Sequence, residues 1–344
     1  MARRSGGKRK LRVGVIGLRL GRQHANGFRD SPSAELAALC DVDRAMLEER
    51  GREYGVDNLF TSHKEMVKSG CVDAVAVALP NRLHKRIAVD CLRGGMHVLV
   101  EKPMAMNARE AQSMVDAARK ARRTLMVAMC NRFRRDIQYA REVVDSGKLG
   151  KPYLAHAMYW RRHGIPGSPT YAVKKNAGGG ALIDIGVHLL DLVLHVMGWP
   201  KVKSVSGHAV CKFGHTQSFK MDVDDYAGAF LRLASGAALF LEVSWALHGS
   251  RHEQSGVHIY GDKAGIETNP LKIMTVDEHG AELNIEPQVK GTGWAESFAI
   301  EDDHFAKRVL AGKKVIPTAE QGRDMMVILD AIYKSAKTGR EIRL

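Results

Sequence analysis

Short apolar runs alternate with amphipathic segments over the first third of the chain. The runs have the length of β-strands, and the segments between them repeat apolar residues at the spacing of helices. Two helical segments open on capping pairs, Ser62 with Glu65 and Asn107 with Glu110. This alternation predicts a parallel sheet covered by helices on both faces. The predicted strands span residues 11–16, 34–40, 74–79, 97–100 and 124–130.

The pattern changes in the second half of the chain. After a helix predicted at residues 137–144, most apolar runs follow one another without helical segments, which predicts a mainly antiparallel sheet. A final helix is expected to begin after Thr318, with Gln321 completing its cap, and to run to about residue 338. The predicted strands of this half span residues 153–160, 202–211, 226–233, 237–245, 257–260 and 271–276.

The most apolar helix is predicted at residues 178–195, where three glycines precede about four helical turns. Four ionisable residues, spaced four, three and four apart, fall on one face of it. Such groups on a buried helix are costly unless they are paired or used in chemistry. Two interpretations stay open: a core helix whose polar stripe bonds to backbone, or a proton-handling site. The four residues are Asp184, His188, Asp191 and His195.

Length and composition are those of an ordinary soluble protein, because 344 residues suffice for two domains and 45% are hydrophobic. We expect no apolar run long enough to span a membrane. The apolar run at residues 13–18 is too short for a signal peptide, so a cytoplasmic location is expected. The five cysteines are scattered singly, which favours free thiols in a reducing compartment.

The net charge of +14 is concentrated at the start of the chain. Six basic residues and no acid lie among the first twelve residues, and we expect a solvated basic tail over residues 1–10. Nucleic-acid binding is not expected, since neither a zinc finger nor an RNP-type motif accompanies the charge. The milder excess elsewhere suits an anionic small molecule such as a dinucleotide. The six residues are Arg3, Arg4, Lys8, Arg9, Lys10 and Arg12.

The turn after the first predicted strand indicates a nucleotide site. It has the pattern G-x-x-x-G, where the dinucleotide fingerprint is G-x-G-x-x-G, and the next helix presents its N-terminal amides to a pyrophosphate. Asp41 follows the second strand 20 residues beyond this turn, the offset at which an acid binds ribose hydroxyls and repels a 2′-phosphate. NAD is therefore preferred to NADP. The turn consists of Gly17, Leu18, Arg19, Leu20 and Gly21.

Two later strand ends carry polar residues. Pro80-Asn81 follows one strand, with His84 three residues on, and Glu101-Lys102-Pro103 follows the next. Ligands of open α/β sheets bind beyond the carboxyl ends of the strands, so Asn81 and Lys102 are expected to face the nicotinamide. A lone lysine after a strand is usually a surface charge, but its place between Glu and Pro at this edge favours a functional one.

Residues just before the 178–195 helix, and aromatics in the predicted strands, are further candidates for ligand contact. Arg161 begins a basic loop that contacts a hydroxylated ligand or is simply exposed. Trp245 and Tyr226 are candidate platforms for a sugar ring, although aromatics in strands are more often core residues.

These motifs, in this order, resemble the Gfo/Idh/MocA oxidoreductases, the glucose–fructose oxidoreductase and inositol dehydrogenase type. The E-K-P and G-G-G…D-x3-H elements are the most specific parts, and the resemblance covers the chain after the basic tail. It implies a Rossmann domain at residues 11–131 and an α+β domain at 132–344. The second domain would carry an open-faced, mainly antiparallel sheet used for self-association to a dimer or tetramer, and its last helix would pack back on the first domain.

The resemblance implies NAD-dependent oxidation of a secondary hydroxyl of a sugar, sugar derivative or inositol. Lys102, Asp184 and His188 take the places of the catalytic residues, with His188 as general base. A redox-neutral NAD-dependent glycoside hydrolase is the alternative, and a non-catalytic NAD-binding sensor or a zinc site is less favoured. Expected cofactor contacts are Gly17 to Gly21, Asp41, Pro80, Asn81, His84, Glu101 and Lys102, and expected substrate contacts are Lys102, Arg132, Arg161, Asp184 and His188, with no metal.

Overall fold

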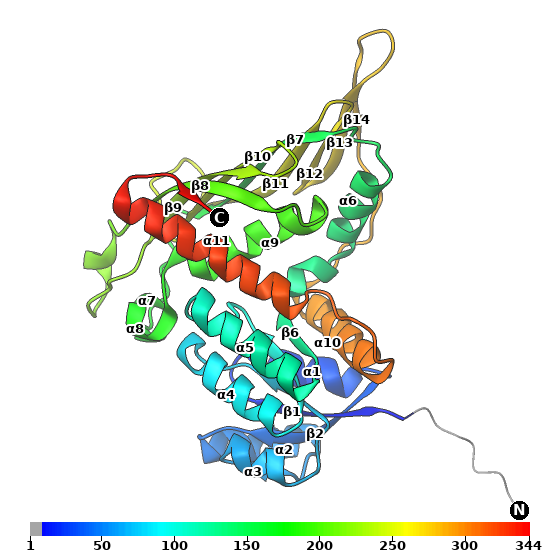
Figure 1. The fold of residues 1–344 in the computed structure, drawn as a ribbon, viewed down its shortest axis with the longest axis vertical. Coiled ribbons are helices and arrows are strands. Elements are labelled where there is room, and N and C mark those ends of the chain that lie inside the picture. The colour runs from blue at the N-terminus through cyan, green and yellow to red at the C-terminus, as the bar shows by residue number, and fades with distance from the viewer. Residues whose placement is uncertain (1–8) are drawn as a thin grey trace, which may run out of the picture.

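The computed structural model describes residues 9–344 and shows two lobes, each built on one sheet (Figure 1). The predicted basic tail therefore lies almost wholly outside the described residues. Within residues 9–344, the first lobe holds six parallel strands in the order β3-β2-β1-β4-β5-β6. These strands are β1 (Leu11–Ile16), β2 (Ala34–Cys40), β3 (Leu59–Phe60), β4 (Ala74–Val77), β5 (His97–Glu101) and β6 (Leu125–Ala128).

Helices cover both faces of this sheet, which is why its central strands read as unbroken apolar runs. All four residues of β4 are buried. From β1 to β3 successive strands are added on one side of β1, and from β4 to β6 on the other side, so a crevice forms at the carboxyl ends of β1 and β4. The covering helices are α1 (Arg22–Asp30), α2 (Arg44–Tyr54), α3 (His63–Lys68), α4 (Asn81–Arg93) and α5 (Ala108–Ala121).

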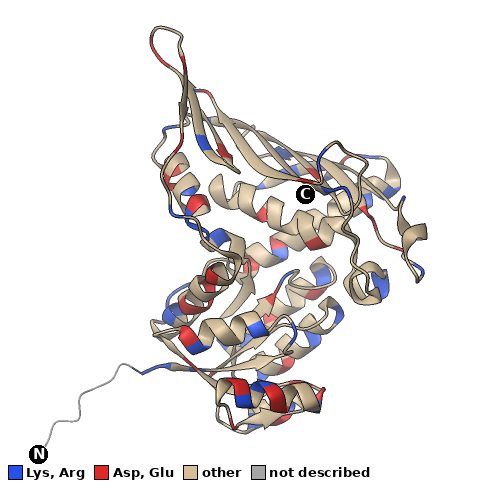
Figure 2. Ribbon diagram, turned by 180° about the vertical axis from the view of Figure 1, so that it is seen from behind, with Lys and Arg blue, Asp and Glu red and all other residues tan. Residues whose placement is uncertain are grey.

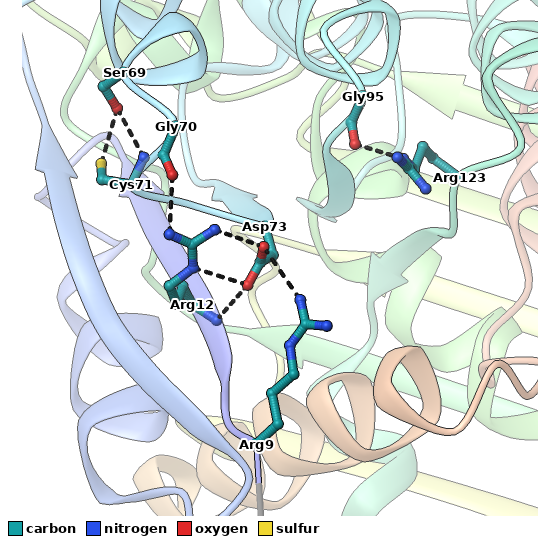
Figure 3. A network of polar contacts seen from close by, with 8 residues as sticks. All are labelled: Arg9, Arg12, Ser69, Gly70, Cys71, Asp73, Gly95 and Arg123. Atoms are coloured by element: carbon teal, nitrogen blue, oxygen red, sulfur yellow. Dashed lines mark hydrogen bonds and ion pairs between the residues drawn. The ribbon is translucent and has the colours of Figure 1, made fainter.

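The start of β1 is fastened to the start of β4 by charged residues (Figure 3). Arg12 Nε and Nη2 bond to the Asp73 carboxylate at 3.1 and 2.8 Å, and Nη1 donates to Gly70 O at 2.9 Å. Arg9 lies 3.7 Å from the same carboxylate. Two of the six N-terminal basic residues are thus paired rather than free in solvent.

The second lobe is built on a larger mixed sheet. Within the described chain it has nine strands in the order β14-β13-β12-β11-β7-β10-β9-β8-β15, and neighbours are antiparallel except β7 and β10. The short strands β12, β14 and β15 were not predicted. The strands are β7 (Pro152–Arg161), β8 (Val202–Val210), β9 (Tyr226–Leu233), β10 (Ala238–Ser244), β11 (Glu253–Gly261), β12 (Gly265–Thr268), β13 (Leu271–Val276), β14 (Glu282–Ile285) and β15 (Ile342–Arg343).

Helices cover one face of this sheet, and the most apolar of them lies between the sheet and the first lobe. The segment Lys174–Val196 has a mean hydropathy of 1.6 and, by length and composition, could span a membrane. The expectation that no apolar run is long enough for this is therefore wrong. Protein buries 83% of the apolar window of this segment, as in a core helix. The elements here are η1 (Cys130–Phe133), α6 (Arg135–Asp145), α7 (Pro169–Ala172), α8 (Lys174–Ala177), the π-helical turn η2 (Leu182–Gly186), α9 (Val187–Val196) and η3 (Gly214–Thr216).

The last two long helices return to the first lobe (Figure 1). The helix α10 (Trp294–Leu310), which was not predicted, packs against α1. The helix α11 (Ala319–Thr338) begins on the predicted capping box and lies against both α5 and β8. Its Asp330 accepts a hydrogen bond from the Ala108 amide at 2.8 Å, across the two lobes. The lobes are therefore joined by sequence-distant helices as well as by the chain crossing after β6.

The opposite face of the large sheet is open. In Figure 2 most of the ribbon of this sheet is tan, the colour of residues other than Lys, Arg, Asp and Glu. Phe240, on β10, is 47% exposed, and its ring centroid lies 5.0 Å from that of Phe230 and 6.3 Å from that of His156. These three side chains come from adjacent strands and form an aromatic row, in which Phe240 is exposed and the other two are half-buried.

Candidate active site

A cleft of about 570 Å³ opens at the carboxyl ends of β1, β2, β4 and β5. Its volume lies in the range of small-molecule sites, roughly 300–1,000 Å³. The first lobe contributes strand-end residues, and the second lobe closes one side with Thr170, Tyr171, Gly179, Ile183 and Asp184. The two lobes thus share one site.

The glycine turn lies at one end of this cleft. Its first four residues line the cleft, and Gly21 leads directly into α1. Amides at the N-terminus of a helix are groups that can bind a pyrophosphate. Asp41 also lines the cleft, and its Oδ2 accepts the Leu18 amide at 2.8 Å. The carboxylate therefore holds the turn as well as facing the ligand. This set of turn amides and a strand-end acid fits the diphosphate and ribose of NAD.

The structure places only some of the second group of predicted cofactor residues in the cleft. Pro80 and Asn81 line the cleft, and Asn81 Nδ2 donates to Ala177 O at 2.9 Å, across the lobes. His84 is buried, with its ring nitrogens 2.8 Å from Pro103 O and 2.6 Å from Leu79 O. Among residues 9–344 it is not one of those lining the cleft. It braces the turn that carries Lys102.

Lys102 meets Asp184 across the cleft. Lys102 Nζ donates to both the Oδ1 and the backbone O of Asp184, each at 2.9 Å. Burial alone would lower the pKa of Lys102, but the charge and hydrogen bond of Asp184 outweigh it and raise that pKa. Burial likewise opposes ionisation of Asp184, yet Lys102 holds its pKa below the ordinary value. An ammonium and a carboxylate therefore face each other at neutral pH.

His188 follows Asp184 by about one helical turn and is a neutral imidazole. Burial is the largest cause that lowers its pKa, to about 3; the Lys102 charge adds to it and Asp184 opposes it. Its buried Nδ1 has no hydrogen-bond partner within the described chain. The ring is therefore unprotonated at neutral pH, and one of its two nitrogens is a hydrogen-bond acceptor.

Asp191, the third residue of the polar stripe, belongs to a structural ion pair. Asp191 Oδ1 and Oδ2 each lie 2.7 Å from the Arg132 guanidinium, and Arg132 is only 1% exposed. Arg132 Nη1 also donates to Gln321 at 2.9 Å, joining η1, α9 and α11. The structure thus places Arg132, an expected substrate contact, in the interior instead of the cleft. Arg161 lies at the end of β7, bonded to Tyr159 and 3.7 Å from Glu253, and its substrate contact stays a prediction.

Comparison with known proteins identifies this arrangement. A profile described as "Oxidoreductase family, NAD-binding Rossmann fold" matches residues 11–129, and one described as "GFO/IDH/MocA C-terminal domain" matches residues 137–267. The D-glucoside 3-dehydrogenase of Escherichia coli K12 is 33% identical over 97% of both chains. The chain belongs to the Gfo/Idh/MocA oxidoreductase family.

Other relatives of this Gfo/Idh/MocA chain have related names. The myo-inositol 2-dehydrogenase of Thermotoga maritima is 27% identical, over 97% of this chain and 98% of its own. A levoglucosan dehydrogenase solved with NADH and L-sorbose has a TM-score of 0.86 at 23% identity, covering 97% of this chain and 99% of its own, which shows a shared fold. The predicted family, fold class and NAD-binding first domain are confirmed, and the protein is an oxidoreductase.

Sequence reasoning missed how Asp184 is held in this family member. Trp245, considered as a sugar platform, is fully buried, and its Nε1 donates to Asp184 Oδ2 at 3.1 Å. Both carboxylate oxygens of Asp184 are therefore engaged, one by Lys102 and one by Trp245. The carboxylate anchors the ammonium, whereas the sequence led us to expect Asp184 as a substrate contact. No local pattern links positions 184 and 245.

Asp224 was missed as well, and it supports the start of the active-site helix. Its Oδ1 accepts the Gly180 amide at 2.8 Å and its Oδ2 accepts the Leu182 amide at 2.9 Å, which caps η2 from another segment. A Cβ at Gly180 would lie 1.8 Å from the Asp224 carbonyl oxygen, so this close approach requires glycine. The three glycines in the sequence were the available signal.

Proposed function

We propose that the protein oxidises a secondary hydroxyl of a sugar, sugar derivative or inositol, with NAD as the hydride acceptor. The observation that carries this proposal is the contact of Lys102 with Asp184, which joins the two lobes at one side of the cofactor cleft. His188 lies one helical turn from Asp184 and feels both charges, although it is not among the described residues that line the cleft. The names of the relatives, a glucoside dehydrogenase and an inositol dehydrogenase among them, support the substrate class.

The chemistry needs a base and a positive charge. An alcohol is a very weak acid, so its proton must be accepted as negative charge develops on the oxygen. The neutral His188 accepts that proton, and the Lys102 ammonium stabilises the developing alkoxide. Asp184 keeps Lys102 charged and in place. NAD, when bound, supplies the hydride acceptor; the glycine turn and Asp41 would hold it.

A substrate screen with NAD tests the proposal. Glycosides, inositols and aldoses are supplied in turn, and the absorbance of the reduced nicotinamide is followed. We expect NADH to accumulate with at least one of them. Release of free sugar from a glycoside without NADH would instead support the redox-neutral hydrolase, and neither product with any compound would favour the sensor.

The role of His188 is tested by replacing it. We expect His188→Ala to lower turnover by about 10²–10⁴-fold while NADH binding is retained, because the general base is lost and the cofactor turn is untouched. His195→Ala is the matched control, since His195 lies on the same stripe but is influenced by the charges of Arg132 and Arg141, whereas His188 is influenced by those of Lys102 and Asp184. Turnover unchanged by His188→Ala would remove this residue from the mechanism.

We also propose that a second copy of the chain covers the open face of the large sheet. The aromatic row of His156, Phe230 and Phe240 crosses three adjacent strands there. Burying such a row against the same row of another copy removes apolar area from water on both partners.

A further inference from the structure

A cluster of ionisable side chains lies in the interior between α1, β5 and α10, behind the cofactor cleft. In the part of the chain that the structure describes, it contains His24, Glu101, Glu301 and Asp302, which are 1%, 3%, 0% and 0% exposed. Of these residues only Glu101 borders the cleft. Charged groups this deeply buried are costly unless they are paired or serve a purpose.

Hydrogen bonds connect this cluster to the active site in an unbroken row. Asp302 Oδ1 lies 2.8 Å from His24 Nδ1, and His24 Nε2 lies 3.2 Å from Glu101 Oε1. The second oxygen of Glu101 accepts the backbone amide of Lys102 at 2.9 Å. The side chain of Lys102 then reaches Asp184. The row therefore runs from α10, near the end of the chain, to the catalytic lysine.

The balance of charge in the row is consistent with its geometry. Burial opposes a charge on His24, but Asp302 and Glu101 raise its pKa well above the ordinary value. The ring is then an imidazolium that donates from both nitrogens to two carboxylates. Burial raises the pKa of Glu301 well above the ordinary value, so this fourth side chain is a neutral acid.

A glycine in α1 permits the contact with α10. Gly27 lies three residues after His24, on the same face of the helix. A Cβ at this position would lie 2.1 Å from Asp302 Oδ2. Glycine is unfavourable inside a helix relative to alanine, and here the close approach of Asp302 accounts for it.

We propose that His24 and Asp302 are positioning residues for the reaction: acting through Glu101, they fix the backbone of Lys102 and so the place of its ammonium in the cleft. This inference rests on the proposed function in taking Lys102 as a reacting group. Because α1 starts at the glycine turn, the same row links the cofactor-binding turn to Lys102. Glu101, expected as a cofactor contact, acts in this scheme by holding the lysine.

The test uses two variants in the row and one matched control. His24→Gln and Asp302→Asn change groups that do not border the cleft and preserve side-chain size as far as possible. Asp303→Asn changes the next residue of α10, whose carboxylate bonds to Ser31 at 2.7 Å and to Lys307, outside the row. Glycoside oxidation is expressed per NADH-binding site, so that loss of folded protein is not counted as loss of activity.

A second measurement needs no substrate. Lysine ¹³C-labelled at Cε is incorporated during expression, and the Lys102 signal is assigned by its absence in Lys102→Arg. Its NMR titration gives the Lys102 pKa in each protein. If the row positions Lys102 against Asp184, this pKa falls toward the ordinary lysine value in His24→Gln and Asp302→Asn. This readout distinguishes failure of the inference from failure of the proposed function, which would leave all proteins inactive.

We expect kcat to fall about 10-fold or more in both row variants, with NADH affinity and substrate KM within about twofold, because small misplacements of a reacting group are costly. Asp303→Asn should match the wild type in every measurement. An unchanged Lys102 pKa and an unchanged kcat in the row variants would overturn the proposal. So would one equivalent of tightly bound metal in the purified protein, since the atoms of His24, Glu301 and Asp302 lie within 4.8 Å of one another and would then be ligands.

Discussion

At the scale of single residues, Trp245 is a positioning contact of Asp184. We expect Trp245→Phe to lower the free energy of unfolding by about 2 kcal/mol, because it removes a hydrogen bond to a charged group and keeps a buried aromatic ring. Turnover should fall as the Asp184–Lys102 geometry loosens. Trp160→Phe is the control, since the buried Nε1 of Trp160 has no partner within residues 9–344. Equal losses in the two variants would refute a specific role for the Trp245 hydrogen bond.

Replacing Arg132 distinguishes a structural role of this residue from a role in substrate binding. Arg132→Met leaves Asp191 as an unpaired buried carboxylate, so we expect a loss of about 3 to 5 kcal/mol of stability in urea unfolding. Arg134→Met breaks the more exposed pair with Asp136, at a cost of about 1 kcal/mol or less. If Arg132 contacts substrate instead, its replacement would raise KM with little loss of stability.

At the scale of elements, the helix ends show which capping signals the tertiary structure uses. Thr318 and Gln321 form the predicted box, so Thr318→Ala should destabilise the protein by about 1 kcal/mol. Ser62 was predicted to cap in the same way, but within the described chain its side chain makes no capping hydrogen bond. Ser62→Ala should therefore change stability by less than about 0.5 kcal/mol. Equal effects of the two substitutions in urea unfolding would contradict this.

At the scale of the whole molecule, the proposed self-association is assigned to the open face of the large sheet. We expect Phe240→Glu to yield a smaller particle than the wild type in size-exclusion chromatography with light scattering, because it places a charge in the aromatic row. Leu310→Glu alters a side chain of α10 that is 39% exposed and should leave the size unchanged. A wild-type monomer would contradict self-association altogether.

Cofactor choice also belongs to the whole molecule, since the cleft is completed by both lobes. NAD at 100 times its Kd should add about 2.7 kcal/mol of stability, visible as a rise in Tm. NADP should raise Tm less, because Asp41 repels a 2′-phosphate. In Asp41→Asn the difference between the cofactors should shrink. Asp57→Asn, which alters an exposed acid that is not among the described residues lining the cleft, should preserve it. An equal response of the wild type to both cofactors would refute the preference.

The sequence alone determined those features whose signal is local. Four strands were predicted with the observed limits, at residues 11–16, 34–40, 226–233 and 271–276. Their apolar residues follow a regular pattern because one or both faces of each strand are buried. The capping box of α11 is likewise a local signal, because Thr318 and Gln321 lie within four consecutive residues. The residues of the cleft were found through motifs at strand ends, where a parallel sheet brings distant loops to one edge.

Only the tertiary structure decided what depends on contacts between distant residues. α10 was missed because it buries Glu301 and Asp302, which read as a polar face until α1 is packed against them. Positions 184 and 191 are both aspartates of one helical stripe, yet one faces Lys102 in the cleft and the other pairs with buried Arg132. An aspartate has the same chemistry at both places. Its role is set by the charge that folding brings beside it, and that neighbour is not specified by local spacing.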